Sequence, residues 1–213
     1  MRVKICGIKR IEDALKAIEF GADAIGLLIK TQSKNSIDEN TAREIVRTLP
    51  PFCSSVMVVI TTDIKEIVEL SRYIGVTAIQ LHGENSPEDI LNIKRELPFV
   101  KIIKTLHVTN IETINNCKKY FKIADAILLD STNFSGGAVG GTGLTHDWSI
   151  SRKIVEESPI PVILAGGLNP ENVAEAVKIV EPYGVDVQSG VNGEDGFKDY
   201  AKLERFIKKA AVG

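Results

Sequence analysis

Arg2-Val3-Lys4-Ile5-Cys6-Gly7-Ile8 opens the chain with a short apolar run that ends on a cysteine and a glycine. A charged segment with helical periodicity, Ile11 to Phe20, follows at once, and a second apolar run, Ala24 to Ile29, comes after it. Strands that are covered on both faces are apolar throughout, so this order of strand, helix and strand is typical of a parallel sheet. The stretch predicts a βαβ unit with a thiol at the mouth of its first strand.

The same unit recurs to the end of the chain. Six further strand-like runs follow: Ser55 to Ile60, Ala78 to His82, Val100 to Leu106, Ala124 to Asp130, Pro161 to Ala165 and Val185 to Ser189. The other helix-period segments are Glu39 to Leu49, Ile64 to Ile74, Pro87 to Leu97, Ile111 to Phe121, Ser149 to Glu157, Pro170 to Val180 and Tyr200 to Ala210. Strict alternation predicts a parallel sheet with right-handed crossovers. Eight units in 213 residues favour an α/β fold of the (β/α)8 TIM-barrel type over an open doubly wound sheet.

The composition fits one domain. With 44% hydrophobic and 25% charged residues, a chain of this length can bury a full core. No linker or low-complexity tract divides it, so we expect residues 1–213 to form a single barrel domain. The formal net charge of −2, with basic and acidic residues interspersed, gives no basic stripe. Nucleic acid and anionic membrane surfaces are therefore unsupported as partners, and a small-molecule substrate is expected.

The cysteines and the hydropathy pattern indicate a cytoplasmic protein. Cys6, Cys53 and Cys117 are odd in number and form no CxxC pair, which argues against a disulfide framework or a thiolate metal site and favours free thiols. The N-terminus enters a strand without a leader, and no stretch approaches the ~18 apolar residues of a membrane span. The sequence leaves a monomer and a homodimer equally open.

Two strand ends carry groups suited to acid–base chemistry. Cys6 ends the first strand, and Asp130 ends the almost wholly apolar run Ala124 to Asp130. An acid at the end of such a strand is costly unless it is used or paired, although Asp130 could simply cap the loop that follows. Cysteine, for its part, is often only a small buried hydrophobe. We interpret Cys6 and Asp130 as a candidate base and acid, and Cys53 and Cys117 as structural.

Glycines follow the last strands. A long glycine-rich interruption, Ser131 to Asp147, comes directly after Asp130 and is expected on the active-site face of a barrel. Gly166-Gly167 follows the seventh predicted strand and Ser189-Gly190 ends the eighth. Glycine lets the backbone approach a ligand closely, and barrels often bind phosphate after strands seven and eight. We therefore predict a phosphate site at Gly166, Gly167, Ser189 and Gly190.

Several motifs run in order over essentially the whole chain. They are Lys4-Ile5-Cys6-Gly7-Ile8, Gln80-Leu81-His82-Gly83, Leu128-Leu129-Asp130, Gly140-Gly141-Thr142-Gly143 with Asp147-Trp148, Ala165-Gly166-Gly167-Leu168-Asn169-Pro170-Glu171-Asn172-Val173, and Gly184-Val185-Asp186-Val187 with Ser189-Gly190-Val191. Together they resemble the phosphoribosylanthranilate isomerase family of tryptophan biosynthesis, whereas any one of them occurs in other phosphate-binding barrels. The resemblance implies an Amadori rearrangement of an N-(5-phosphoribosyl) arylamine to a 1-deoxyribulose 5-phosphate.

By this resemblance, Asp130 is the general acid that opens the sugar ring and Cys6 is the base that removes the C2 proton. Ordinary pKa values near 3.9 and 8.5 mean that both groups need tuning toward neutrality. The substrate is a phosphosugar, and its imine nitrogen is the electron sink, so neither a metal nor an organic cofactor is implied. His82, Asn35, Gly141 and Gly143 fall at positions that imply contact with the substrate.

Departures from the family pattern fall near the expected site of the aglycone. Family members usually carry an arginine where Asn35 stands, and that arginine is thought to hold the anthranilate carboxylate. Asn35 has no cationic fork, although Lys34 or Lys30 could act as a point charge. Gln188, Asn192 and His146 also differ from the residues usual in the family. The sequence therefore leaves a different phosphoribosyl amine as an alternative substrate.

Other readings are less well supported. A metal-dependent epimerase needs histidines at several strand ends, and the first three predicted strands have none. A related barrel that closes an indole ring would need lysine and glutamate at several strand ends. Lys104 lies within the fifth predicted strand, but matching glutamates are not evident. A non-catalytic phosphosugar-binding barrel would keep the glycines without needing Cys6 and Asp130. His82 could bond neighbouring backbone instead of substrate, Asp186 is expected to accept from local amides, and His107 is expected on the surface.

Overall fold

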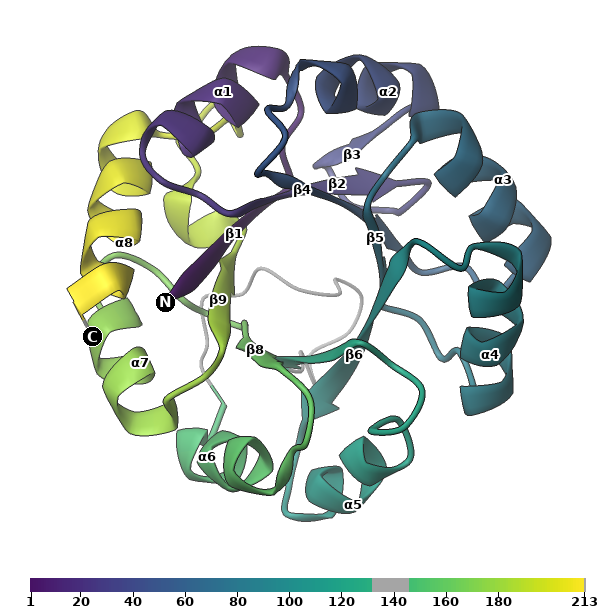
Figure 1. The fold of residues 1–213 in the computed structure, drawn as a ribbon. Coiled ribbons are helices and arrows are strands. Elements are labelled where there is room, and N and C mark those ends of the chain that lie inside the picture. Colours follow the sequence, from purple (N-terminus) through teal and green to yellow (C-terminus); the bar gives the residue numbers. More distant parts are fainter. Residues whose placement is uncertain (132–145, 213) are drawn as a thin grey trace.

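The computed structural model describes residues 1–131 and 146–212 of the chain. In these two segments, eight parallel strands close into a barrel, a ninth strand lies outside it, and eight α-helices form the outer ring (Figure 1). The strands are β1 (Arg2–Cys6), β2 (Ala24–Ile29), β3 (Ser36–Ile37), β4 (Ser54–Val59), β5 (Ala78–Leu81), β6 (Lys101–Val108), β7 (Ala126–Ser131), β8 (Val162–Leu164) and β9 (Gly184–Val187). This confirms the predicted (β/α)8 barrel.

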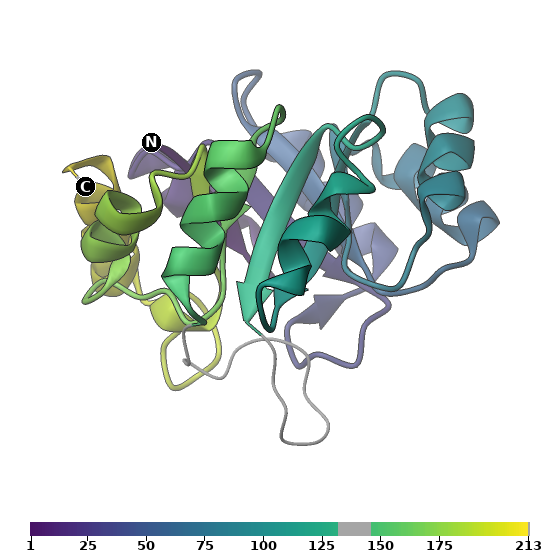
Figure 2. The ribbon, with the colours of Figure 1, turned by 90° about the horizontal axis from the view of Figure 1, so that it is seen from below.

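The helices cover the outside of the strands, as Figure 2 shows from the side. They are α1 (Ile11–Glu19), α2 (Glu39–Thr48), α3 (Ile64–Ile74), α4 (Pro87–Glu96), α5 (Glu112–Lys118), α6 (Trp148–Glu157), α7 (Val173–Val180) and α8 (Tyr200–Val212), with a single 3-10 turn η1 (Ser189–Val191) after β9. None of the helices in the described residues is long and apolar enough to cross a membrane.

The barrel closes because β1 pairs with both β2 and β9. The remaining strand, β3, was not predicted. It forms because the chain after β2 folds back, so that Ser36 pairs with Leu28, and the Ser36 Oγ accepts from the amide of Thr31 and donates to the Leu28 carbonyl. The connection between β2 and β3, residues 30–35, lines the cavity at the C-terminal ends of the strands.

Alternation along the strands divides the core into two layers. Val3 and Ile5 of β1 pack in one cluster with Ala14 and Ala17 of α1, outside the barrel. Lys4 lies between them and points inward, where it reaches β5. Inside the barrel, a small apolar cluster fills the lower layer, formed by Val56, Ala78, Ile103, Ala126, Leu128 and Ala165. Lys4, Gln80 and Asp186 are buried in the barrel interior together with this cluster.

The start of α7 differs from the prediction. The sequence indicated a helix from Pro170, whereas the helix begins at Val173. Two asparagine side chains take the intervening amides: Asn169 Oδ1 accepts from Glu171 and Asn172, and Asn172 Oδ1 accepts from Asn169. These local bonds offer the backbone an alternative to the helix, so residues 169–172 form a turn.

Candidate functional site

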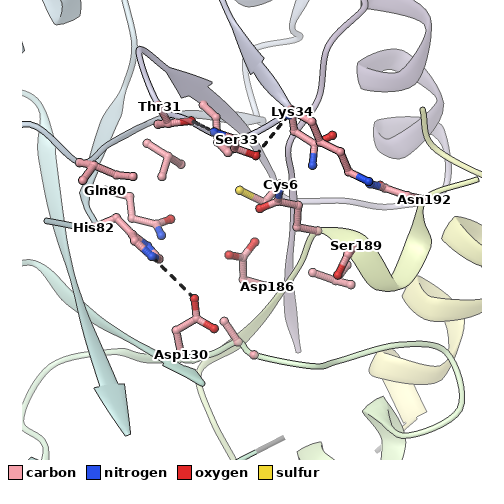
Figure 3. Close-up of a pocket in the computed structure, with 18 of the residues that line it drawn as sticks. Cys6, Thr31, Ser33, Lys34, Gln80, His82, Asp130, Asp186, Ser189 and Asn192 are labelled. Carbon is pink, nitrogen blue, oxygen red and sulfur yellow. Dashed lines mark hydrogen bonds and ion pairs between the residues drawn. The ribbon is translucent and has the colours of Figure 1, made fainter. Parts of the chain in front are cut away.

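A cavity of about 920 Å³ opens at the C-terminal ends of the strands. Its wall includes Cys6 from β1, His82 after β5, Asp130 from β7, the loop Gly166-Gly167 after β8, and Ser189 after β9. Figure 3 shows Cys6, His82 and Asp130 around one space, with Asp186 between Cys6 and Asp130. Residues far apart in the sequence thus meet at the face where barrels carry their sites.

Cys6 is buried at the end of β1 with its sulfur against Gly26 of β2. A Cβ atom at Gly26 would lie 2.8 Å from the Cys6 Sγ, so the thiol occupies space that only glycine leaves open. Burial raises the pKa of the Cys6 thiol, and the ammonium of Lys4 opposes that rise. Burial thus disfavours the thiolate form of Cys6, and the adjacent ammonium favours it.

Lys4 is the centre of a buried cluster of polar side chains that sequence reasoning missed. Its Nζ donates to Gln80 Oε1 at 2.7 Å and to Asp186 Oδ2 at 2.9 Å. The expectation that Asp186 accepts from local amides is wrong, because its described partner is this lysine. Lys4 precedes Cys6 by two residues and so faces the same side of the strand, which was the available signal.

Asp130 is buried and carries an unusually basic carboxyl. Its Oδ1 accepts from the amide of Ser131 at 2.8 Å, and its Oδ2 lies 4.0 Å from His82 Nε2 (Figure 3). Burial raises the pKa of Asp130 to about 6, against the lowering effect of the Ser131 amide. A carboxyl with this pKa keeps a useful fraction protonated near neutral pH, as a general acid requires.

The histidines near Asp130 are neutral. Burial, followed by the nearby His107, lowers the pKa of His82 to about 3. The two rings meet edge to face with centroids 5.2 Å apart. His107 was expected on the surface; it is half-buried instead, because β6 extends two residues beyond the predicted end and pairs His107 with Asp130. His82 therefore lies beside Asp130 as an uncharged ring, at a distance longer than a hydrogen bond.

The two predicted phosphate loops touch each other. Gly166 and Gly167 have φ values of +81° and +67°, a region that favours glycine. A Cβ at Gly190 would lie 2.0 Å from the carbonyl oxygen of Leu168, so η1 packs directly on the loop after β8. Gly166, Gly167 and Ser189 line the cavity, whereas Gly190 allows the close approach of the two loops.

The segment after β2 forms the opposite wall. Asn35 is buried and lines the cavity, and its Oδ1 has no hydrogen-bond partner in the described parts of the chain. Two lysines of this segment also line the cavity. Lys30 is held 2.8 Å from Glu66, whereas Lys34 has no ion pair within residues 1–131 and 146–212. Lys34 is therefore the available cation on this wall.

The other residues that depart from the family pattern lie in two different parts of the structure. Gln188 and Asn192 line the cavity and are tied together by Lys198, whose Nζ donates to the Gln188 carbonyl at 2.9 Å and to Asn192 Oδ1 at 2.7 Å. Burial lowers the pKa of Lys198 to about 8. His146 does not line the cavity; its ring contacts Ser131 and α6. Gly141 and Gly143 lie outside the described residues.

A closed parallel barrel, a cavity at the C-terminal ends of its strands and an acid and a thiol in the cavity wall are together typical of (β/α)8-barrel enzymes. The model of the N-(5'-phosphoribosyl)anthranilate (PRA) isomerase family matches residues 3–209. The chain belongs to this family.

Similar proteins support the assignment over the full length. N-(5'-phosphoribosyl)anthranilate isomerase 2 of Methanosarcina mazei is 48% identical over 212 residues, which cover 99% of this chain and 94% of that protein. The crystal structure of phosphoribosyl anthranilate isomerase from Thermotoga maritima superimposes with a TM-score of 0.88 at 37% identity, covering 99% of this chain and 98% of that one. Another solved isomerase, in complex with reduced 1-(o-carboxyphenylamino)-1-deoxyribulose 5-phosphate, gives 0.86 at 36% identity, with 99% and 98% covered.

Proposed function

We propose that this protein isomerises N-(5'-phosphoribosyl)anthranilate to 1-(2-carboxyphenylamino)-1-deoxyribulose 5-phosphate, the Amadori step of tryptophan biosynthesis. One observation carries the proposal: Cys6 and Asp130 face the same cavity from β1 and β7, with the glycine loop after β8 in its wall. A relative of the same fold was solved with the reduced form of this product. The site thus offers a base, an acid and a place for phosphate around one sugar.

The reaction begins with one proton transfer from Asp130 and one to Cys6, and it ends with tautomerisation to the ketone. The Asp130 carboxyl gives its proton to the ring oxygen as the C1–O bond breaks, and the nitrogen lone pair forms a C1=N iminium. The Cys6 thiolate then removes the C2 proton, and the electrons of the C–H bond form a C1=C2 enolamine while the iminium nitrogen becomes neutral. The C2 hydroxyl finally loses its proton as C1 gains one, which yields the ketone. No redox partner is consumed.

Acid and base reach the sugar from different parts of the wall. β9 and β8 separate β1 from β7 in the sheet, so the two side chains approach the substrate from separate directions. The buried Lys4 ammonium stabilises the thiolate that the second step needs. Neutral His82 stands beside the acid and can accept from or donate to a sugar hydroxyl without competing for the proton.

The phosphate is proposed to lie over the loops after β8 and β9. Gly166 and Gly167 expose backbone amides through their left-handed conformations, and Ser189 begins η1 in the same wall. Such amides bind an anion without a dedicated side-chain charge. This placement sets the sugar between the glycine loops and the segment after β2, which leaves the aromatic ring near Lys34 and Asn35.

We assign the anthranilate carboxylate to Lys34. Asn35 is neutral and Lys30 is already paired with Glu66, so Lys34 is the cation on this wall that can receive the carboxylate. A lysine ammonium is a point charge on a flexible stem, and it binds a carboxylate less selectively than an arginine fork does. The buried Asn35 side chain supplies a hydrogen-bonding amide next to it.

The test of the substrate is turnover of freshly prepared phosphoribosylanthranilate, followed as loss of its fluorescence with the product identified by mass. Phosphoribosylaniline, which lacks the carboxylate, is the comparison substrate. We expect turnover of phosphoribosylanthranilate by the unmodified protein. In the Lys34→Met variant, the KM for phosphoribosylanthranilate should rise about tenfold, while the KM for phosphoribosylaniline should stay unchanged. Rapid turnover of the aniline substrate with none of the anthranilate would show that the chain serves a different phosphoribosyl amine.

A further inference from the structure

The ring of His146 bridges two hydroxyl groups from different elements. Its Nδ1 lies 3.2 Å from the Oγ of Ser131, at the end of β7, and its Nε2 lies 2.6 Å from the Oγ of Ser151, in α6. Burial lowers the pKa of His146 to about 4, so the ring is neutral near pH 7. A neutral imidazole has one donor and one acceptor, and each hydroxyl can take either role, so both bonds form with either tautomer.

Ser131 is the residue that holds the carboxyl of Asp130. It is buried, and its amide donates to Asp130 Oδ1 at 2.8 Å. On its other side lies Gly166, where a Cβ atom would be 2.2 Å from the Ser131 Oγ and 2.9 Å from Asp130 Oδ1. Ser131 is therefore packed between the proposed phosphate loop and His146, and a shift of Ser131 would displace the carboxyl of Asp130.

We propose that His146 is a positioning residue, whose bonds to Ser131 and Ser151 tie the end of β7 to α6 and thereby fix the orientation of the Asp130 carboxyl. The inference rests on the proposed function, in which Asp130 is the acid. This role would explain a residue that departs from the family pattern, because His146 does not line the cavity.

The consequence for Asp130 has a defined direction. The Ser131 amide lowers the pKa of Asp130, because it bonds to the charged carboxylate. The other titratable groups that face Asp130 are Lys4 on β1, His82 after β5, His107 on β6 and Asp186 on β9. A substitution at position 146 leaves these four groups in place. Loosening Ser131 should therefore raise the pKa of Asp130.

The experiment compares His146→Phe and Ser151→Ala with the unmodified protein. The protonation midpoint of Asp130 is followed through the NMR shift of the Ser131 amide, which needs no turnover, and kcat and KM are measured on the same samples. We expect the midpoint to rise by about 0.5 pH unit in both variants. We also expect kcat to fall about tenfold with little change in KM, because the acid is misplaced while the binding groups remain.

Asp147→Ala is the matched control. Asp147 caps α6 by accepting from the Ser149 amide at 2.9 Å, so its loss weakens the start of the same helix without removing either bond of His146. The Asp147→Ala substitution should lower the melting temperature and leave the protonation midpoint of Asp130 unchanged. An unmoved midpoint in both His146→Phe and Ser151→Ala, or an equal movement in Asp147→Ala, would overturn the inference. Absence of turnover in the unmodified protein would count against the proposed function alone, because the midpoint is still measured.

Discussion

Lys4 and Cys6 show how a single strand places a charge beside a reactive group. Alternation puts both side chains on the inner face of β1, two residues apart. Lys4 is held there by Asp186 and Gln80, and its ammonium opposes the rise in the pKa of Cys6 that burial causes. The same residue thus pairs with Asp186 in the barrel interior and favours the thiolate form of Cys6.

Replacing Lys4 by Met should separate these two effects. The variant leaves the Asp186 carboxylate buried without its partner, and we expect the free energy of unfolding to fall by about 3–5 kcal/mol in urea titrations. Alkylation of Cys6, located by peptide mass, should shift to higher pH because the thiolate has lost its cation. The double variant Lys4→Met/Asp186→Leu removes both charges, so it should recover stability, and it should recover the alkylation profile in part, because the Asp186 carboxylate raises the pKa of Cys6 while the Lys4 ammonium lowers it. An alkylation profile that does not move in Lys4→Met would contradict a role for the Lys4 charge.

Sequence reasoning found the residues that end strands and missed those that depend on a distant partner. Cys6, His82 and Asp130 were predicted because each ends an apolar run, and the structure places all three in one cavity. A lysine inside such a run has no evident purpose until Asp186, 182 residues away, is placed beside it. His107 was misplaced because a boundary error of two residues moved it from a strand to the surface.

Among the elements, the loop after β8 packs against Asp130 and also carries the proposed phosphate site. Gly166 has a φ value of +81°, and it leaves the space that Ser131 and Asp130 occupy. The loop then continues into the turn at 169–172, where asparagine side chains delay the start of α7. The sequence could predict the glycine loop from its position after a strand, but it could not show which neighbour requires the glycine.

Gly166→Ala should damage both functions of this loop. The added methyl group would meet the Ser131 Oγ at 2.2 Å, in a backbone conformation that alanine disfavours. We expect a lower melting temperature, a weaker affinity for inorganic phosphate by calorimetry, and a lower kcat. Gly75→Ala is the control, since Gly75 also has a positive φ value but has open space around its Cβ position. An equal loss of melting temperature in the two variants would show that backbone strain alone, and not the contact with Ser131, explains the lower stability of Gly166→Ala.

Across the whole molecule, burial of Asp130 links stability to pH. Folding raises the pKa of Asp130 from 3.8 to about 6, so the folded protein binds this proton more tightly than the unfolded chain does. The stabilisation is fully present below pH 4 and is lost as the pH rises through 6. The acid role proposed for Asp130 near neutral pH therefore carries a cost in stability.

Asp130→Asn should be more stable than the unmodified protein at high pH. A rise of about two pKa units corresponds to about 3 kcal/mol, and the amide never acquires the buried charge. We expect a gain of up to this size at pH 8, narrowing to nearly zero at pH 4, in urea unfolding curves collected across that range. A gain that stays constant with pH would mean that the charge of Asp130 is not its cause.

Cys6 and Asp130 are proposed to carry out the chemistry in one cavity while other groups bind the substrate. The most direct test measures turnover of phosphoribosylanthranilate and binding of the reduced product analogue on the same preparations of the unmodified protein, Cys6→Ser and Asp130→Asn. We expect both variants to bind the analogue within a few-fold of the unmodified protein and to lose turnover by about 10²–10⁴-fold. Turnover at the unmodified rate in either variant would contradict this proposal.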